Sequence, residues 1–166
     1  MAIVKNANMN KLQAKSPEFI FPAITQVQAA YIAGIIDGEG YIGIQRGTKG
    51  TYHLRVAVTS VSEELVNWLQ EKTGFGTIAF ADLHHRGRQN TYSWRVFGGE
   101  ALLLLKLVAA YLLIKKAQAA IAMRFQENTH LRGEDRRVFG RRCSDSIKLL
   151  NSRQAWLQNV GNASLS

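Results

Sequence analysis

The sequence contains little cysteine, little proline and no long apolar run. Cys143 is the only cysteine among 166 residues, which excludes an internal disulfide and a zinc site built on several cysteines. We therefore expect an intracellular, reducing compartment, either cytoplasm or an organelle matrix. Both prolines, Pro17 and Pro22, precede residue 25, so the chain after them is free to form regular structure. We predict an N-terminal arm over 1–24 and a single domain over 25–166.

Acidic residues are also scarce, which gives the chain a large positive charge. There are 21 Lys and Arg against 12 Asp and Glu, a formal net charge of +9. Such an excess favours a polyanionic partner such as nucleic acid. The most apolar stretch, 101–114, is interrupted by Lys106 and is shorter than the roughly 20 residues that span a bilayer. We expect no membrane segment and interpret this stretch as a helix buried on most sides.

Periodicity and capping residues predict an α-β-β-α-β-β-α-α order followed by a helical tail. Thr25 and Gln28 have capping-box spacing ahead of a helix over 29–37. Ser62 begins a second helix that ends at Gly74. Alternating apolar residues predict two hairpins, with strands at 41–47, 51–59, 76–83 and 91–97. The later helices are expected at 101–114, then to about 129, and over 131–160. This order predicts an α+β fold, an antiparallel four-stranded sheet with helices on one face and a helical C-terminal tail.

Strand alternation gives the predicted sheet one apolar face and one polar face. Phe80, Trp94 and Val96 are expected to point inward, together with their apolar neighbours at alternate positions. The polar face is expected to carry Gln45, His53, Arg55, Thr59, Thr77, Thr91, Ser93 and Arg95. A two-stranded ribbon fits the DNA major groove, and such side chains read base edges. A solvated face, common in antiparallel sheets, is the alternative interpretation.

The tip of the second hairpin is polar and basic. His84 and His85 are neighbours with no cysteine nearby and no nearby acid except Asp82, which is a poor spacing for a zinc site. Arg86 and Arg88 are better interpreted as contacts to the DNA backbone.

The segment Tyr31–Tyr41, YIAGIIDGEGY, resembles the motif of the LAGLIDADG homing endonucleases. Five of its nine central letters match and the other four are conservative. A second segment, Tyr111–Gln118, is similar to the family's L-x-x-K-K-x-Q element. The resemblance covers about residues 25–130 and implies the homing-endonuclease fold. It also implies an intron-encoded, metal-dependent DNA endonuclease that makes a staggered double-strand cut in a long target.

Small residues recur every four positions along the motif helix, at Ala30, Gly34 and Gly38. Such a stripe lets two helix backbones approach closely; tight packing on the chain's own sheet is the alternative. The resemblance implies that two motif helices form an interface, with Ala33 and Asp37 as further members. Because the chain has one motif and no visible repeat, the resemblance is to the single-motif, homodimeric branch. A two-fold dimer implies a near-palindromic double-stranded DNA target.

The resemblance also assigns an active site. Its metal-binding acid falls at Glu39, with the Gly38 carbonyl as a further ligand, and Mg²⁺ suits such oxygen donors. Lys115 matches the active-site lysine, while Gln118 and Ser60 fall near positions of polar helpers. The expected catalytic residues are therefore Glu39, Lys115, Gln118 and Ser60. We interpret Asp37 as a residue that bonds the backbone or caps the helix end.

Two other functions compete with the endonuclease. A non-catalytic nucleic-acid binder on the same fold, an intron maturase or a DNA-binding regulator, would add RNA as a partner. A ribosome-associated basic protein would need no metal. The presence of both Glu39 and Lys115 favours the enzyme.

Overall fold

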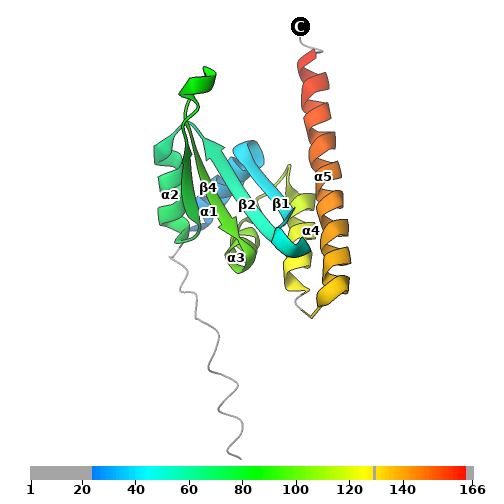
Figure 1. Ribbon diagram of the computed structural model, residues 1–166. Coiled ribbons are helices and arrows are strands. Elements are labelled where there is room, and N and C mark those ends of the chain that lie inside the picture. Colours follow the sequence, from blue (N-terminus) through cyan, green and yellow to red (C-terminus); the bar gives the residue numbers. More distant parts are fainter. Residues whose placement is uncertain (1–23, 129, 164–166) are drawn as a thin grey trace, which may run out of the picture.

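The computed structural model describes residues 24–128 and 130–163, without the side chains of Arg86 and of 156–163. The predicted N-terminal arm lies outside these residues. The elements are α1 (Gln26–Glu39), β1 (Gly40–Arg46), β2 (Tyr52–Ser60), α2 (Glu63–Thr73), β3 (Thr77–Ala81), β4 (Thr91–Phe97), α3 (Gly98–Val108), α4 (Lys116–Glu127) and α5 (Gly133–Ala163) (Figure 1). This order confirms the α+β fold expected from the sequence.

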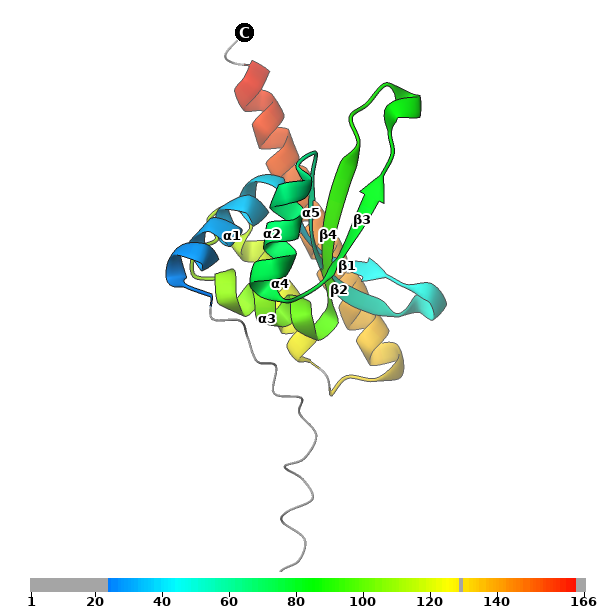
Figure 2. The ribbon, with the colours of Figure 1, turned by 90° about the vertical axis from the view of Figure 1, so that its left-hand side faces the viewer.

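The four strands form one antiparallel sheet in the order β1-β2-β4-β3. Helices α1, α2 and α3 lie on one face, and both hairpin tips point away from them (Figure 2). Between the sheet and the helices lies a core that includes Val56, Trp94, Leu104 and Phe125, all fully buried. Each such side chain contributes about 1.5–3 kcal/mol on burial. Among the described residues, no helix lies over the opposite face of the sheet (Figure 2).

Local sequence determines where the first helix begins and ends. The Thr25 hydroxyl accepts a hydrogen bond from the Gln28 amide at 3.2 Å, and the Thr25 amide donates to the Gln28 side chain at 2.9 Å. This capping box confirms the predicted start of α1. At the other end Gly40 follows directly into β1, and a Cβ there would lie 2.5 Å from the Ile36 carbonyl oxygen. Only glycine permits this abrupt change from helix to strand.

The structure differs from the sequence prediction at two apolar segments. The predicted helix over 101–114 ends at Val108, and Leu113 is 86% exposed. Further along, the amides of residues 113–115 bond to the Asp37 carboxylate and are not available to extend the helix. Phe80, expected inward, is 56% exposed. It lies on an edge strand near the projecting hairpin tip, where it packs against Tyr92 with ring centroids 5.2 Å apart.

Helix α5 is a single helix that covers the edge strand β1 and packs against α4 (Figure 1). The Ser144 hydroxyl donates to the Ile44 carbonyl of β1 at 2.7 Å, so it satisfies a backbone group that an edge strand otherwise leaves unpaired. Gly140 lies against Tyr52, where a Cβ would come within 2.7 Å of the tyrosine side chain. Among the described residues, no helix combines the length and apolar character needed to cross a membrane.

Candidate active site and nucleic-acid interface

The motif residue Asp37 connects the end of α1 to the loop between α3 and α4. Its carboxylate accepts hydrogen bonds from the backbone amides of Leu113 (2.7 Å), Ile114 (3.2 Å) and Lys115 (2.9 Å). This confirms the interpretation that Asp37 bonds the backbone. Because its carboxylate is buried and occupied within its own chain, it is not available to a dimer interface, contrary to expectation.

Lys115 lies beside the C-terminal end of α1. Its ammonium donates a hydrogen bond to the Asp37 carbonyl. Burial lowers the pKa of Lys115, while the charges of Asp37 and Glu39 act in the opposite direction. Glu39 is the last residue of α1 and is exposed. The structure thus brings an exposed carboxylate and a half-buried lysine, predicted from separate segments, to one edge of the molecule.

A hollow of about 330 Å³ opens at this edge, next to Lys115. Its walls include Gly38 and Tyr41 on one side and Asn151 and Gln154 of α5 on the other. The Gln154 side chain donates to the Ile114 carbonyl at 2.6 Å, so α5 also holds the loop that carries Lys115. Asn151 and Gln154 were not predicted from the sequence, because no local pattern relates them to a motif more than 100 residues away.

Two of the expected catalytic residues, Gln118 and Ser60, form hydrogen bonds within the chain. Gln118 is 0% exposed, and its amide donates to Asn151 (3.3 Å) and Gln154 (2.9 Å). It cannot touch a substrate, so its assignment as a catalytic residue is wrong; it links α4 to α5. Ser60 accepts a hydrogen bond from the Ser62 amide at 3.0 Å. It ends β2 two residues past Val58, the strand partner of Gly40, and its direct role stays a prediction.

One chain supplies few metal ligands at this edge. Among the described residues, no three His, Cys, Asp or Glu side chains gather into a metal site. Asp37 is occupied by the loop, which leaves the Glu39 carboxylate and the backbone carbonyls at the end of α1, including that of Gly38. These hard oxygen donors suit Mg²⁺ in type. Their small number means that a second copy of the chain or DNA phosphates would have to complete the coordination.

The uncovered face of the sheet carries the predicted polar residues together. Strand register places Gln45 beside His53, Thr59 beside Ser93, and Arg95 between Ala57 and Thr77. The predicted polar residues that share this face are Gln45, His53, Arg55, Thr59, Thr77, Thr91, Ser93 and Arg95. Arg88 is exposed at the hairpin tip, whereas the side chain of Arg86 lies outside the described residues.

Arg55 and Arg95 form the charged centre of this face. Burial lowers the pKa of Arg55, and so does the nearby charge of Arg95, while Tyr41 acts in the opposite direction. The Nε atoms of both arginines are buried and have no hydrogen-bond partner among the described residues. The Arg55 guanidinium carbon lies 5.9 Å from the ring centroids of both Tyr41 and Phe97. Two like charges held together without an acidic partner in the described chain favour an external anion or hydrogen-bond acceptor. Tyr41 was not among the residues predicted for this face, and its contact with Arg55 becomes evident only in the folded chain.

The stripe of small residues on α1 is open to solvent. Ala30, Gly34 and Gly38 are exposed, and a Cβ at either glycine would meet no atom within 4 Å. Val27 on the same helix is 80% exposed. Ala33, by contrast, is 0% exposed in the chain's own core, so its assignment to a dimer interface is wrong. The stripe is therefore not used for packing within the chain, and it lies beside exposed apolar side chains of the kind that mark an interface.

Comparison with known proteins gives one family and one fold. Residues 26–114 match the family model described as LAGLIDADG-like domain. The homing endonuclease I-CvuI, in complex with its target in the presence of Ca, is 18% identical over 75% of this chain and 82% of its own, with a TM-score of 0.66. With another target, in the presence of Mg and with DNA not cleaved, I-CvuI gives 20% identity over the same shares and a TM-score of 0.63. The archaeal intron-encoded homing endonuclease I-Vdi141I, complexed with DNA, gives 21% identity over 75% of this chain and 84% of its own, with a TM-score of 0.58. Among curated proteins none matches significantly.

The Asp37 hydrogen bonds predict a specific loss of stability. Asp37→Asn should lower the free energy of unfolding by about 1–3 kcal/mol, because an amide places a donor against one of three backbone N–H groups. Glu39→Gln, which removes a carboxylate two residues away without a backbone partner, should change it by less than about 0.5 kcal/mol. Urea unfolding of both variants measures the difference. Equal effects of the two substitutions would show that the Asp37 bonds do not hold the loop.

Proposed function

Because the chain belongs to the LAGLIDADG homing endonuclease family, as a chain with one motif, we propose that it is a site-specific, metal-dependent DNA endonuclease that acts as a homodimer. The observation that carries this proposal is the shared edge of Glu39 and Lys115: Glu39 is the last residue of α1, and the Lys115 ammonium donates to the Asp37 carbonyl at the same helix end. Through Tyr41, which also lines the hollow at that edge, the edge continues into the sheet face that carries Arg55 and Arg95. This arrangement supports a proposed cutting site next to a proposed base-reading surface on the same chain.

The proposed substrate is double-stranded DNA. The homing endonucleases I-CvuI and I-Vdi141I, whose folds are similar to that of this chain, form complexes with DNA. A four-stranded sheet with a polar, basic face also suits a major groove. A guanidinium such as that of Arg55 or Arg95 can bond two-pronged to a guanine, which discriminates against other bases by about 1–3 kcal/mol. The lack of acidic residues among the side chains predicted for this face removes a source of repulsion toward phosphates.

The proposed cofactor is Mg²⁺, held by Glu39 and the Gly38 carbonyl. Structures of the similar endonuclease I-CvuI in the presence of Ca or Mg support a divalent cation. When bound, such an ion lowers the pKa of a coordinated water and offsets phosphate charge. Lys115 adds a second positive charge at the same edge, where developing negative charge on the cleaved phosphate needs stabilisation.

The proposed homodimer completes the site. Two copies packed along Ala30, Gly34 and Gly38 would bring two Glu39 carboxylates together, which supplies the ligands that one chain lacks. Exposed Val27 and Tyr31 flank the stripe and would be buried by the same contact. A two-fold arrangement presents both sheets to opposite half-sites, so the target should be near-palindromic.

We also propose a reducing compartment for the protein. The single thiol, Cys143, is buried, and burial raises its pKa. A thiol kept protonated and enclosed reacts slowly, as expected of a structural cysteine.

Glu39→Gln tests the chemistry. It should reduce cleavage by at least about 100-fold, because metal stabilisation of several kcal/mol is removed at about 1.4 kcal/mol per factor of ten. DNA affinity should change little, since the sheet face is untouched. The matched control is Glu71→Gln, an exposed carboxylate on α2, which should cleave normally. Measured cleavage by Glu39→Gln at the unaltered rate would overturn the assignment of Glu39. Binding without cutting by the unaltered protein in Mg²⁺ would indicate a non-catalytic nucleic-acid binder instead.

Gly34→Leu tests the dimer. A single chain has open space at Gly34, so the variant should fold, but its side chain should hold two helices apart and yield monomers. Gly99→Leu places the same side chain in open space on α3 and should stay dimeric. Sedimentation distinguishes the 18.5 kDa chain from its dimer. A folded Gly34→Leu variant that remains a dimer would show that the interface lies elsewhere.

A further inference from the structure

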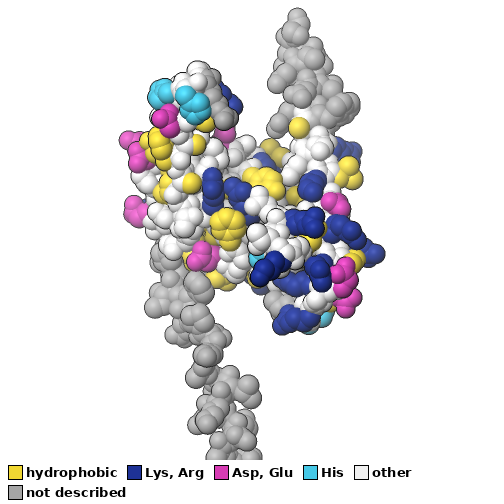
Figure 3. Space-filling view, viewed as in Figure 1, with side chains coloured by type: hydrophobic (Ala, Val, Ile, Leu, Met, Phe, Trp, Pro, Cys, Tyr) yellow, Lys and Arg dark blue, Asp and Glu magenta, His cyan; other side chains and the backbone are white. Residues whose placement is uncertain are grey.

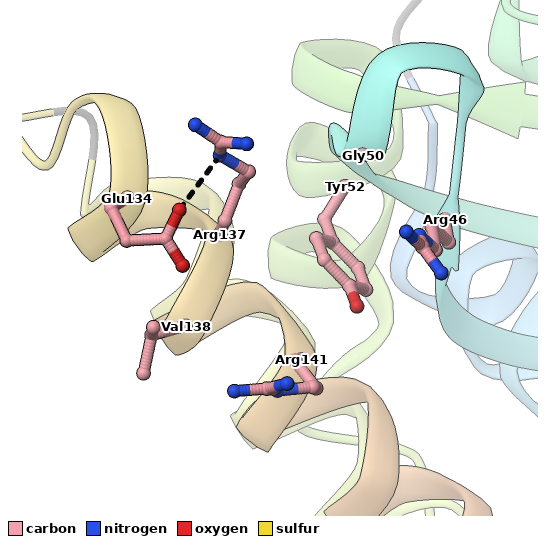
Figure 4. A pocket seen from close by; sticks show the side chains of 7 residues that line it. All are labelled: Arg46, Gly50, Tyr52, Glu134, Arg137, Val138 and Arg141. Carbon is pink, nitrogen blue, oxygen red and sulfur yellow. Dashed lines mark ion pairs between the residues drawn. The ribbon is translucent and has the colours of Figure 1, made fainter.

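A basic groove runs between α5 and the β1–β2 hairpin, at the edge of the sheet. Three adjoining hollows of about 210, 440 and 630 Å³ make it up, and Tyr52 lines all three. In Figure 4 the Tyr52 ring lies between Arg46 on the strand side and Arg137 and Arg141 on α5. We call this surface the α5 groove and define it by Arg46, Lys49, Tyr52, Arg137, Arg141 and Lys148.

The α5 groove carries a large excess of positive charge. Seven Lys and Arg side chains line its three hollows, against two acids. Glu134 pairs with Arg137 at 3.2 Å and Asp145 with Lys148 at 3.6 Å. Arg46 and Arg141 are exposed and form no ion pair with any residue of the described chain. The groove is therefore a cationic surface whose own acids are too few to neutralise it.

The groove is held rigidly against the sheet. Gly140 lets α5 approach Tyr52 closely, and the Ser144 hydroxyl bonds to the Ile44 carbonyl of β1 at 2.7 Å. Both contacts lie within the stretch of α5 that carries Arg137, Arg141 and Lys148. The cations on α5 thus have a fixed position relative to the strand edge, which lowers the entropic cost of ordering them on a partner.

The groove is continuous with the base-reading face. Tyr41 and Gln45 line its third hollow and also lie on the uncovered sheet face, and the Tyr41 ring contacts Arg55. Figure 3 shows Lys and Arg side chains gathered over the β1–β2 hairpin and the adjacent part of α5, on the same side of the molecule as the sheet. A sheet seated in a major groove has a sugar–phosphate strand along each border, so the edge strand β1 and α5 would face one of them.

We propose that the α5 groove binds the phosphate backbone of duplex DNA at the border of the major groove that the sheet occupies. This inference rests on the proposed DNA binding, and it adds contacts that carry affinity and register without base discrimination. The family match ends at residue 114, so α5 lies outside the region that the match covers.

The test uses the double variant Arg46→Ala/Arg141→Ala, with Arg142→Ala as control. Arg142 is an exposed arginine next to Arg141 but lines none of the three hollows. Binding to a mixed-sequence duplex is measured without divalent cation at several salt concentrations, and thermal melting checks the fold. The slope of log affinity against log salt should fall by about two units in the double variant. When salt is raised from about 50 to 200 mM, the affinity of the unaltered chain should fall by a factor about ten times larger than that of the double variant. Base preference, measured on a randomised duplex, should stay the same.

Each other outcome has a definite meaning. An unchanged salt slope in a folded double variant would overturn the proposal. An equal change of the slope in Arg142→Ala would also overturn it, because any surface arginine would then give the same effect. Loss of binding to a structured RNA with unchanged binding to duplex DNA would also overturn it and assign the groove to RNA. Failure of the unaltered chain to bind duplex DNA at all would instead contradict the proposed function.

Discussion

Three hydrogen bonds to the Asp37 carboxylate hold together the two segments that form the candidate active site. Without them the loop at 113–115 would lose three of the bonds that fix it to the end of α1, the end at which Glu39 lies. With them, the loop turns at Val108, exposes Leu113 and Ile114, and begins α4 at Lys116. Gln154 holds the same loop from the other side through the Ile114 carbonyl. A buried carboxylate that accepts several backbone N–H groups is strongly stabilised, so this arrangement gives Lys115, the proposed active-site lysine, a fixed position.

The uncovered sheet face does not have to contribute to the hydrophobic core. Its strands are stabilised from the helix side, where Val56 and Trp94 are fully buried, so the other face is free to carry polar side chains. The charge of Arg95 lies close enough to lower the pKa of Arg55, and within the described part of the chain the Nε atoms of both have no hydrogen-bond partner. Such an arrangement is unfavourable for an isolated chain and becomes favourable when an anionic or hydrogen-bond-accepting partner binds. The α5 groove extends this positive surface past the edge of the sheet.

Much of the fold follows from local sequence, because its determinants are local. The Thr25–Gln28 capping box set the start of α1, and alternation assigned the strand faces. The sequence predictions that were wrong depend on contacts between segments far apart in the chain. Gln118 and Ala33 were assigned functional roles from their positions in a motif, yet both are buried by packing that only the folded chain reveals. Phe80 has an inward pattern, but no helix extends far enough to cover it. Asn151 and Gln154 reach the site because α5 lies along the sheet edge, which no periodicity indicates.

The most direct test is a cleavage selection with the unaltered protein. The protein is incubated with Mg²⁺ and a library of randomised DNA duplexes, and the ends of any cut molecules are sequenced. The account predicts cuts in both strands within one long, near-palindromic sequence, and no cuts when a chelator replaces Mg²⁺. An absence of cutting in Mg²⁺, cut ends without two-fold symmetry, or cutting that continues in the chelator would contradict it.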